Sequence, residues 1–176
     1  MILEHVEVID GTGAAPLADR NVRISAGKIA AIMPGADELP RDGATILDLR
    51  GRSVLPGIVG MHDHLFYLAQ PDLRPDGSLE RPAFFVETRF SAPRLYLANG
   101  VTTIRTAGAV EPETELGVQD RIGSIAVGKI ADLVVVKGDP AARIADVENV
   151  ENVFKDGAGY DPKKLLDSVK GRYGEY

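Results

Sequence analysis

Residues 58–64 read Ile-Val-Gly-Met-His-Asp-His, a short apolar run that leads directly into two histidines. Residues 101–106, Val-Thr-Thr-Ile-Arg-Thr, form a second short run rich in β-branched side chains. Between them lie a Pro- and Gly-rich loop at residues 70–82 and a helix signal at residues 91–100, with Ser91 as the expected N-cap. The order strand, loop, helix, strand predicts one βαβ unit with a right-handed crossover.

The sequence before this unit predicts β-structure. Residues 2–9 nearly alternate apolar and polar side chains, as a half-buried strand does. Residues 21–25 and 28–33 flank a glycine-containing turn and have the spacing of a β-hairpin, and residues 45–49 form another short strand. We therefore expect the first fifty or so residues to form an antiparallel, β-rich segment.

The sequence after the unit predicts more strands and a final helix. Residues 132–137 read DLVVVK, bracketed by Asp132 and by Asp139, which we interpret as turn residues, and residues 147–155 contain at least one further strand. Asp161, followed by proline, marks the start of a C-terminal helix. Apolar residues of these strands should form a core that joins both chain ends: Val6, Val8, Ile24, Ile29, Ile32, Leu47, Leu133, Val135 and Val153.

Composition narrows the possible functions. The 176 residues include 26 acidic and 20 basic side chains, giving a net charge of -6, and 44% are hydrophobic, which is typical of a globular protein rather than a disordered one. The absence of cysteine excludes disulfides, thiolate metal sites and a cysteine nucleophile. Without a basic patch, signal peptide or long apolar run, we expect a cytoplasmic protein that binds neither nucleic acid nor membranes.

His62 and His64 are the sharpest chemical signal. Side chains two residues apart on a strand point to the same face, so the two imidazoles should converge, as ligands of Zn, Fe, Ni or Mn do. The alternative is a polar cluster at a strand end. Catalytic zinc sites use three protein ligands, and the remaining histidine, His5, belongs to the first strand of a different module.

Arg105 and Thr106 end the second strand of the βαβ unit. Because parallel α/β structures place their active sites at the carboxyl ends of strands, these residues are candidate substrate contacts on the same rim as the histidines. An ion pair or a solvated strand end is an equally good interpretation of the two residues.

Five segments together resemble the amidohydrolase superfamily, most closely its imidazolonepropionase-like and prolidase-like members. They are VIDGTG at residues 8–13, ISAGKIAAI at 24–32, LDLRGRSVLPGIVGMHDHL at 47–65, LANGVTTIRTAG at 97–108 and RIGSIAVGKIADLVVVKGDP at 121–140. The H-x-H motif after a proline-glycine pair and the late GSI-x-x-GK-x-ADLVV motif are each specific, and they occur in the family's order.

The resemblance implies a metal-dependent hydrolase of C–N bonds, amide or peptide-like, with a small-molecule or dipeptide-like substrate. His62 and His64 match the family's metal-binding pair, and the metal would be a divalent ion, zinc first, with Mn, Fe or Co as alternatives. The fold implied is mixed α/β. Residues 1–55 and 117–160 would form a composite β-sandwich. Residues 56–116 would be a remnant of the β/α metal-binding barrel, comprising its first two βα units, and residues 161–176 would form a C-terminal helix.

The departures from the family pattern are equally informative. A closed barrel needs roughly 200–250 residues by itself, and no histidine follows His64, so most barrel strands and ligands have no counterpart. Three hypotheses remain: an internally truncated hydrolase, a non-catalytic β-sandwich remnant with weak metal binding or an interaction role, and two joined parts of a longer enzyme. Open strand edges lead us to expect a homo-oligomer.

Overall fold

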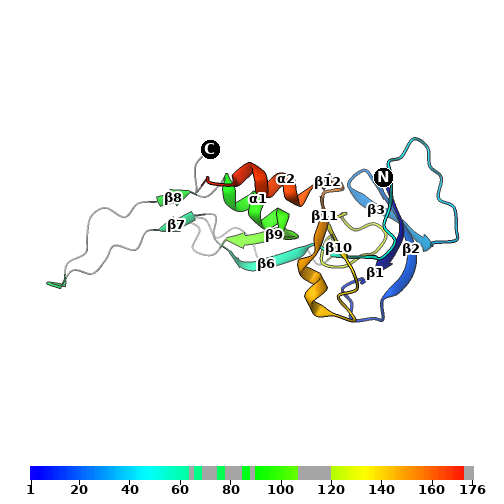
Figure 1. Cartoon of the computed structure of the whole chain (residues 1–176), viewed down its shortest axis with the longest axis horizontal. Helices are drawn as coiled ribbons and strands as arrows, with labels where there is room; N and C mark the ends of the chain where they lie inside the picture. Colours follow the sequence, from blue (N-terminus) through cyan, green and yellow to red (C-terminus); the bar gives the residue numbers. More distant parts are fainter. Residues whose placement is uncertain (64–65, 69–74, 78–84, 88–89, 107–119, 173–176) are drawn as a thin grey trace.

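Strands from both ends of the chain form one hydrogen-bonded sheet. The structure is a computed structural model that describes residues 1–63, 66–68, 75–77, 85–87, 90–106 and 120–172 (Figure 1). In spatial order the sheet contains β12 (Ala158–Tyr160), β11 (Val150–Lys155), β10 (Leu133–Lys137), β5 (Arg52–Pro56), β1 (Ile2–Val8), β2 (Leu17–Ser25) and β3 (Lys28–Pro34), with β4 (Ile46–Asp48) paired to β1.

The two chain ends meet where β5 pairs antiparallel with β10. In this register Val54 lies opposite Val135, and both side chains are fully buried. A 3-10 helix, Ile144–Glu148, connects β10 to β11. Strands from the two chain ends are thus hydrogen-bonded to each other in one sheet, as the sequence led us to expect.

The strand directions correct one prediction. The hairpin of β2 and β3 is antiparallel as expected, and its turn residues Ala26 and Gly27 both have positive φ, as a tight hairpin turn of the I′ kind requires. However, β1 pairs in parallel with both β4 and β5, so the expectation of a wholly antiparallel N-terminal segment is wrong. The chain between β3 and β4 returns to the start of β1, where β4 pairs with it in parallel. The spacing of the strands in the sequence does not reveal this return.

Among the described residues, a cluster of buried apolar side chains is drawn from strands of both chain ends. Ile29 on β3 and Phe154 on β11 belong to the same cluster although their strands lie near opposite ends of the sheet order, so the sheet curls around the core. Ile32 and Leu47 are half-buried against this cluster, and the other core residues expected from sequence are buried: Val6, Val8, Ile24, Ile29, Leu133, Val135 and Val153.

The βαβ unit is present as predicted. Strands β6 (Ile58–Asp63) and β9 (Val101–Thr106) pair in parallel, with α1 (Ser91–Ala98) between them in sequence. Two short strands, β7 (Phe66–Leu68) and β8 (Phe85–Glu87), form an antiparallel pair beyond the end of β6 (Figure 1). The chain is therefore a mixed α/β protein with mostly sheet and few helices in its described part.

The two helix starts have different outcomes. Asp161 caps α2 (Pro162–Val169) as predicted, since its side chain accepts hydrogen bonds from the backbone N–H groups of Lys163 and Lys164. Ser91 is not an N-cap. The backbone of Phe90 is already helical, so Ser91 is the first residue inside the helix. The centroid of the Phe90 ring lies 4.0 Å from the guanidinium carbon of Arg94.

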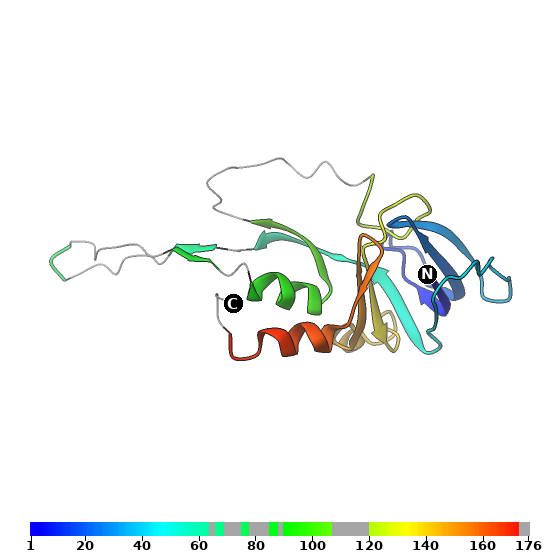
Figure 2. The same cartoon turned by 90° about the horizontal axis from the view of Figure 1, so that it is seen from above.

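Helix α2 runs alongside α1 and contacts β11, which connects the C-terminal helix to both the sheet and the βαβ unit (Figure 2). Neither helix has the length or the apolar character that crossing a membrane requires, and this holds for every helix within the described ranges.

Candidate functional site

The carboxyl ends of β6 and β9 lie side by side. Asp63 is in register with Thr106, so His62-Asp63 and Arg105-Thr106 lie at the same end of a two-stranded parallel sheet. His62 is exposed there. His64, and the side chains of Arg105 and Thr106, lie outside the part of the chain that the structure describes.

A β-bulge interrupts β6 at the histidine. Gly60 pairs with Ile104 and Asp63 with Thr106, so three steps along β6 correspond to two along β9. Bulges re-aim side chains and are frequent next to active sites. The strict alternation from which we expected His62 and His64 to share a face therefore does not hold at this point of the strand.

Asp63 turns back on its own strand. Its Oδ2 atom is buried without a hydrogen-bond partner, and it lies where a Cβ on Gly60 would be. Only glycine at position 60 leaves room for this arrangement. Strand alternation alone would put Asp63 on the face opposite His62, and nothing in the sequence pattern indicates a buried carboxylate oxygen at this position.

Within residues 1–63, 90–106 and 120–172, and the short described pieces between them, no group of three or more His, Asp or Glu side chains is placed to hold a metal ion. His5 does not join the strand ends of the βαβ unit. It lies on β1, and its Nδ1 is 2.8 Å from Oδ1 of Asp19. The assignment of His62 and His64 as metal ligands therefore stays a prediction.

Asp132 was expected to be a turn residue, and its buried carboxylate also holds two neighbouring segments together. Its side chain is 4% exposed, Oδ2 accepts a hydrogen bond from Lys155 Nζ at 2.9 Å, and Oδ1 accepts one from the backbone N–H of Asp156 at 2.8 Å. Burial lowers the pKa of Lys155, but the hydrogen bond and the charge of Asp132 outweigh it and raise that pKa overall. Asp139 is a turn residue as predicted and accepts from Ala141 and Ala142.

Comparison with known proteins gives a family match for part of the chain and a similar fold for most of it. Residues 112–158 match the amidohydrolase family. A crystal structure of a Xaa-Pro dipeptidase with bound methionine in the active site superposes with a TM-score of 0.67 at 12% identity, covering 91% of this chain and 99% of that one. At that identity the likeness shows the fold alone.

Two longer solved chains match in part. A putative prolidase from Bifidobacterium longum has 25% identity and a TM-score of 0.45, covering 61% of this chain and 23% of its own. A D-hydantoinase from Thermus sp. has 18% identity and a TM-score of 0.45, covering 65% and 21%. This chain thus spans less than a quarter of either, and no curated protein matches it.

The family match of residues 112–158 confirms the resemblance to the amidohydrolase superfamily found in the sequence. The matched segment contains β10, which pairs with β5, and β11, which pairs with β10.

Proposed function

We propose that this chain is a metal-dependent hydrolase of the amidohydrolase superfamily that acts on amide or peptide-like C–N bonds. The observation that carries the proposal is the parallel register of β6 and β9, with Asp63 opposite Thr106. It brings the H-x-H segment and Arg105 to the strand ends where β/α enzymes place their catalytic groups. Family membership supports the hydrolase class.

The proposed metal site has two candidate ligands. His62 and His64 supply two imidazoles, whereas a catalytic zinc site typically has three protein ligands. The described residues, which do not include His64, contain no group of three His, Asp or Glu side chains placed to hold a metal ion. A bound divalent ion would supply Lewis acidity and a water of lowered pKa. The ligand set of the described residues does not fit a complete site for such an ion.

The organisation proposed from the sequence gives each part a role. Residues 1–55 and 117–160 would act as the composite β-sandwich, residues 56–116 as the remnant of the metal-binding barrel, and residues 161–176 as the closing helix. Arg105 and Thr106 would contact a small or dipeptide-like substrate, in keeping with solved neighbours named as a dipeptidase and a hydantoinase.

The test compares metal binding and hydrolysis in matched variants. The protein is purified without chelators, its metal content is measured, and Xaa-Pro dipeptides and hydantoins are assayed with added Zn²⁺ or Mn²⁺. We expect the double variant His62→Ala, His64→Ala to lose bound metal and chelator-sensitive hydrolysis. His5→Asn is the control, since asparagine tolerates the positive φ of that position.

A metal-free protein that stays inactive after loading with Zn²⁺ or Mn²⁺ would contradict the hydrolase proposal. It would favour the second candidate, a non-catalytic remnant with weak metal binding or an interaction role. The observation behind this second candidate is the incomplete ligand set of the described residues.

We also propose that the chain forms a homo-oligomer. Ile58 on β6 is 46% exposed and Leu95 on α1 is 41% exposed, so large apolar side chains of the βαβ unit face solvent. Light scattering after size-exclusion chromatography tests this proposal, and a strictly monomeric protein at high concentration would contradict it.

A further inference from the structure

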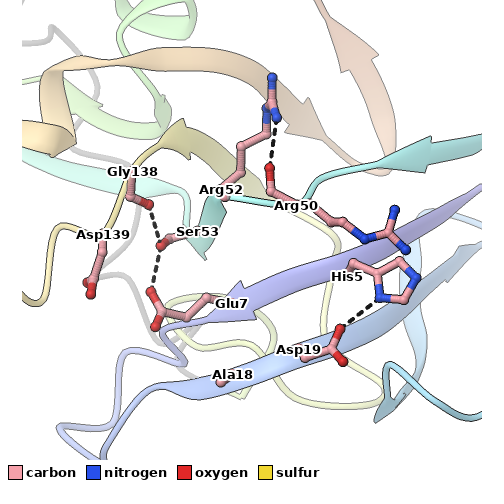
Figure 3. A pocket seen from close by; sticks show the side chains of 10 residues that line it. His5, Glu7, Ala18, Asp19, Arg50, Arg52, Ser53, Gly138 and Asp139 are labelled. Atoms are coloured by element: carbon pink, nitrogen blue, oxygen red, sulfur yellow. Dashed lines mark hydrogen bonds and ion pairs between the residues drawn. The ribbon is translucent and has the colours of Figure 1, made fainter.

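A mixed-charge pocket of about 660 Å³ lies on the composite sheet, on elements other than the β6 and β9 strand ends. Its polar lining comes from β1, β2, β5 and the loops next to β5 and β10 (Figure 3). The volume is within the range of small-molecule sites, which run from roughly 300 to 1,000 Å³. Nothing in the family resemblance assigned a function to these residues.

At one end of this pocket, hydrogen-bond acceptors outnumber donors. Ser53, 1% exposed, has its hydroxyl oxygen 2.7 Å from Oε2 of Glu7 and 2.8 Å from the carbonyl oxygen of Gly138 (Figure 3). A serine hydroxyl has one hydrogen to donate, so the two acceptors share one donor. One of them is left without a full hydrogen bond unless another donor enters the pocket.

Glu7 has no cationic partner within the described residues. Its side chain lies on a half-buried strand position, where a carboxylate normally pairs with a positive charge or several donors. The two arginines that line the pocket do not fill this role. Arg50 pairs with Asp48, and Arg52 pairs with Glu151 and donates to the Arg50 carbonyl.

The other end of the pocket holds a constrained histidine. His5 and Asp19 both have positive φ, of 58° and 49°, a conformation costing non-glycine residues about 1 kcal/mol or more. Their side chains pair at 2.8 Å. If the Nδ1 hydrogen faces Asp19, the Nε2 atom of His5 presents a lone pair, which adds a further acceptor to the lining.

We propose that this pocket binds a small organic ligand through a primary ammonium group, with Glu7 and the Gly138 carbonyl as its acceptors. The ammonium would bring a positive partner for Glu7 and additional hydrogen-bond donors, since the single Ser53 hydroxyl hydrogen can serve only one of the two acceptors. The inference does not depend on the proposed hydrolase activity, because it uses none of the residues at the strand ends of β6 and β9.

The test uses ethylammonium chloride as the probe and follows backbone amide shifts by NMR. We expect saturable shifts at Ser53, Gly138 and Asp139. Tetramethylammonium carries the same charge but has no N–H donor, so it should bind at least tenfold more weakly. Equal binding of the two cations, or no saturable shift with ethylammonium, would overturn the proposal without any substitution.

A pair of variants on one strand localises the binding. Glu7→Gln removes the charge with little change in volume and should weaken ethylammonium binding at least tenfold. Glu4→Gln is the control, since Glu4 also lies on β1 but pairs with Arg41 and does not line the pocket. Unchanged binding in Glu7→Gln, or an equal loss in Glu4→Gln, would refute the assignment.

Discussion

Asp132→Ala should destabilise the composite sheet more than any change to an exposed ion pair. The substitution removes two hydrogen bonds to a buried carboxylate, from Lys155 Nζ at 2.9 Å and from the backbone N–H of Asp156 at 2.8 Å. Hydrogen bonds to charged groups contribute about 1.5–3 kcal/mol each. The Lys155 side chain is 35% exposed, and its Nζ lies 3.4 Å from the Asp156 carboxylate. In the Asp132→Ala variant, water and Asp156 therefore compensate in part for the lost carboxylate.

The net loss should therefore be about 2–4 kcal/mol, somewhat below the ~3–5 kcal/mol for breaking a fully buried ion pair. For a chain of this size that corresponds to a fall in Tm of roughly 4–16 °C. Urea unfolding followed by circular dichroism measures the change through the midpoint at constant m-value. The pKa of Lys155 is raised, so its contribution is present below pH 10.5 and is lost as the pH rises through the higher folded-state pKa.

The matched control is Asp167→Ala on α2. Asp167 pairs with Lys163 at 2.5 Å, but both side chains are well exposed, so we expect no measurable change in unfolding free energy. A loss in Asp132→Ala as small as that in Asp167→Ala would refute the argument that burial makes the Asp132 pair important.

Two further predictions concern backbone strain and acid sensitivity. Gly100→Ala should lower the Tm more than Gly13→Ala does. Both glycines have positive φ, but only at Gly100 would the new Cβ clash, lying 2.8 Å from a methyl group of Val134. Equal losses of Tm in the two variants would contradict this prediction. The hydrogen bond from the backbone N–H of Asp139 lowers the pKa of Asp146. Its contribution is present above the ordinary pKa of 3.8 and is lost as the pH falls through the lower folded-state value, so Asp146→Asn should flatten the acid limb of the stability profile.

Local signals in the sequence were sufficient for one helix cap and for the strands β1–β4, β6 and β9–β11, whereas β5, β7, β8 and β12 were not predicted. The hairpin of β2 and β3 follows from a turn at Ala26-Gly27 between two apolar runs, and the Asp161-Pro162 pair defines the start of α2. The parallel pairing of β1 with β5 was not predictable in this way. It depends on contacts between residues about 46 positions apart, such as Glu7 and Ser53, which no local pattern encodes.

The same distinction applies to the sites. The sequence predicted that the H-x-H segment and Arg105 would leave neighbouring strands at one end, and the register of β6 and β9 agrees. The bulge before Asp63 was not foreseeable, because a bulge is defined by the partner strand. The pocket beside Ser53 was missed for a related reason: its groups come from four separate segments, and none of them carries a recognisable motif.

The βαβ unit and the sheet are coupled through a small junction that contains two glycines. The Gly57 N–H donates to the Asp132 carbonyl at 2.8 Å, and a Cβ at Gly57 would overlap the buried side chain of Thr102 on β9. Gly100 accepts from the Ile58 N–H at 2.9 Å and packs against Val134 of the sheet. The residues of the core cluster that the structure describes all belong to the sheet and its loops. Substitutions at His62 should therefore leave folding intact, whereas Gly57→Ala should disturb both parts at once, since it forces β6, the strand that carries His62, away from β9.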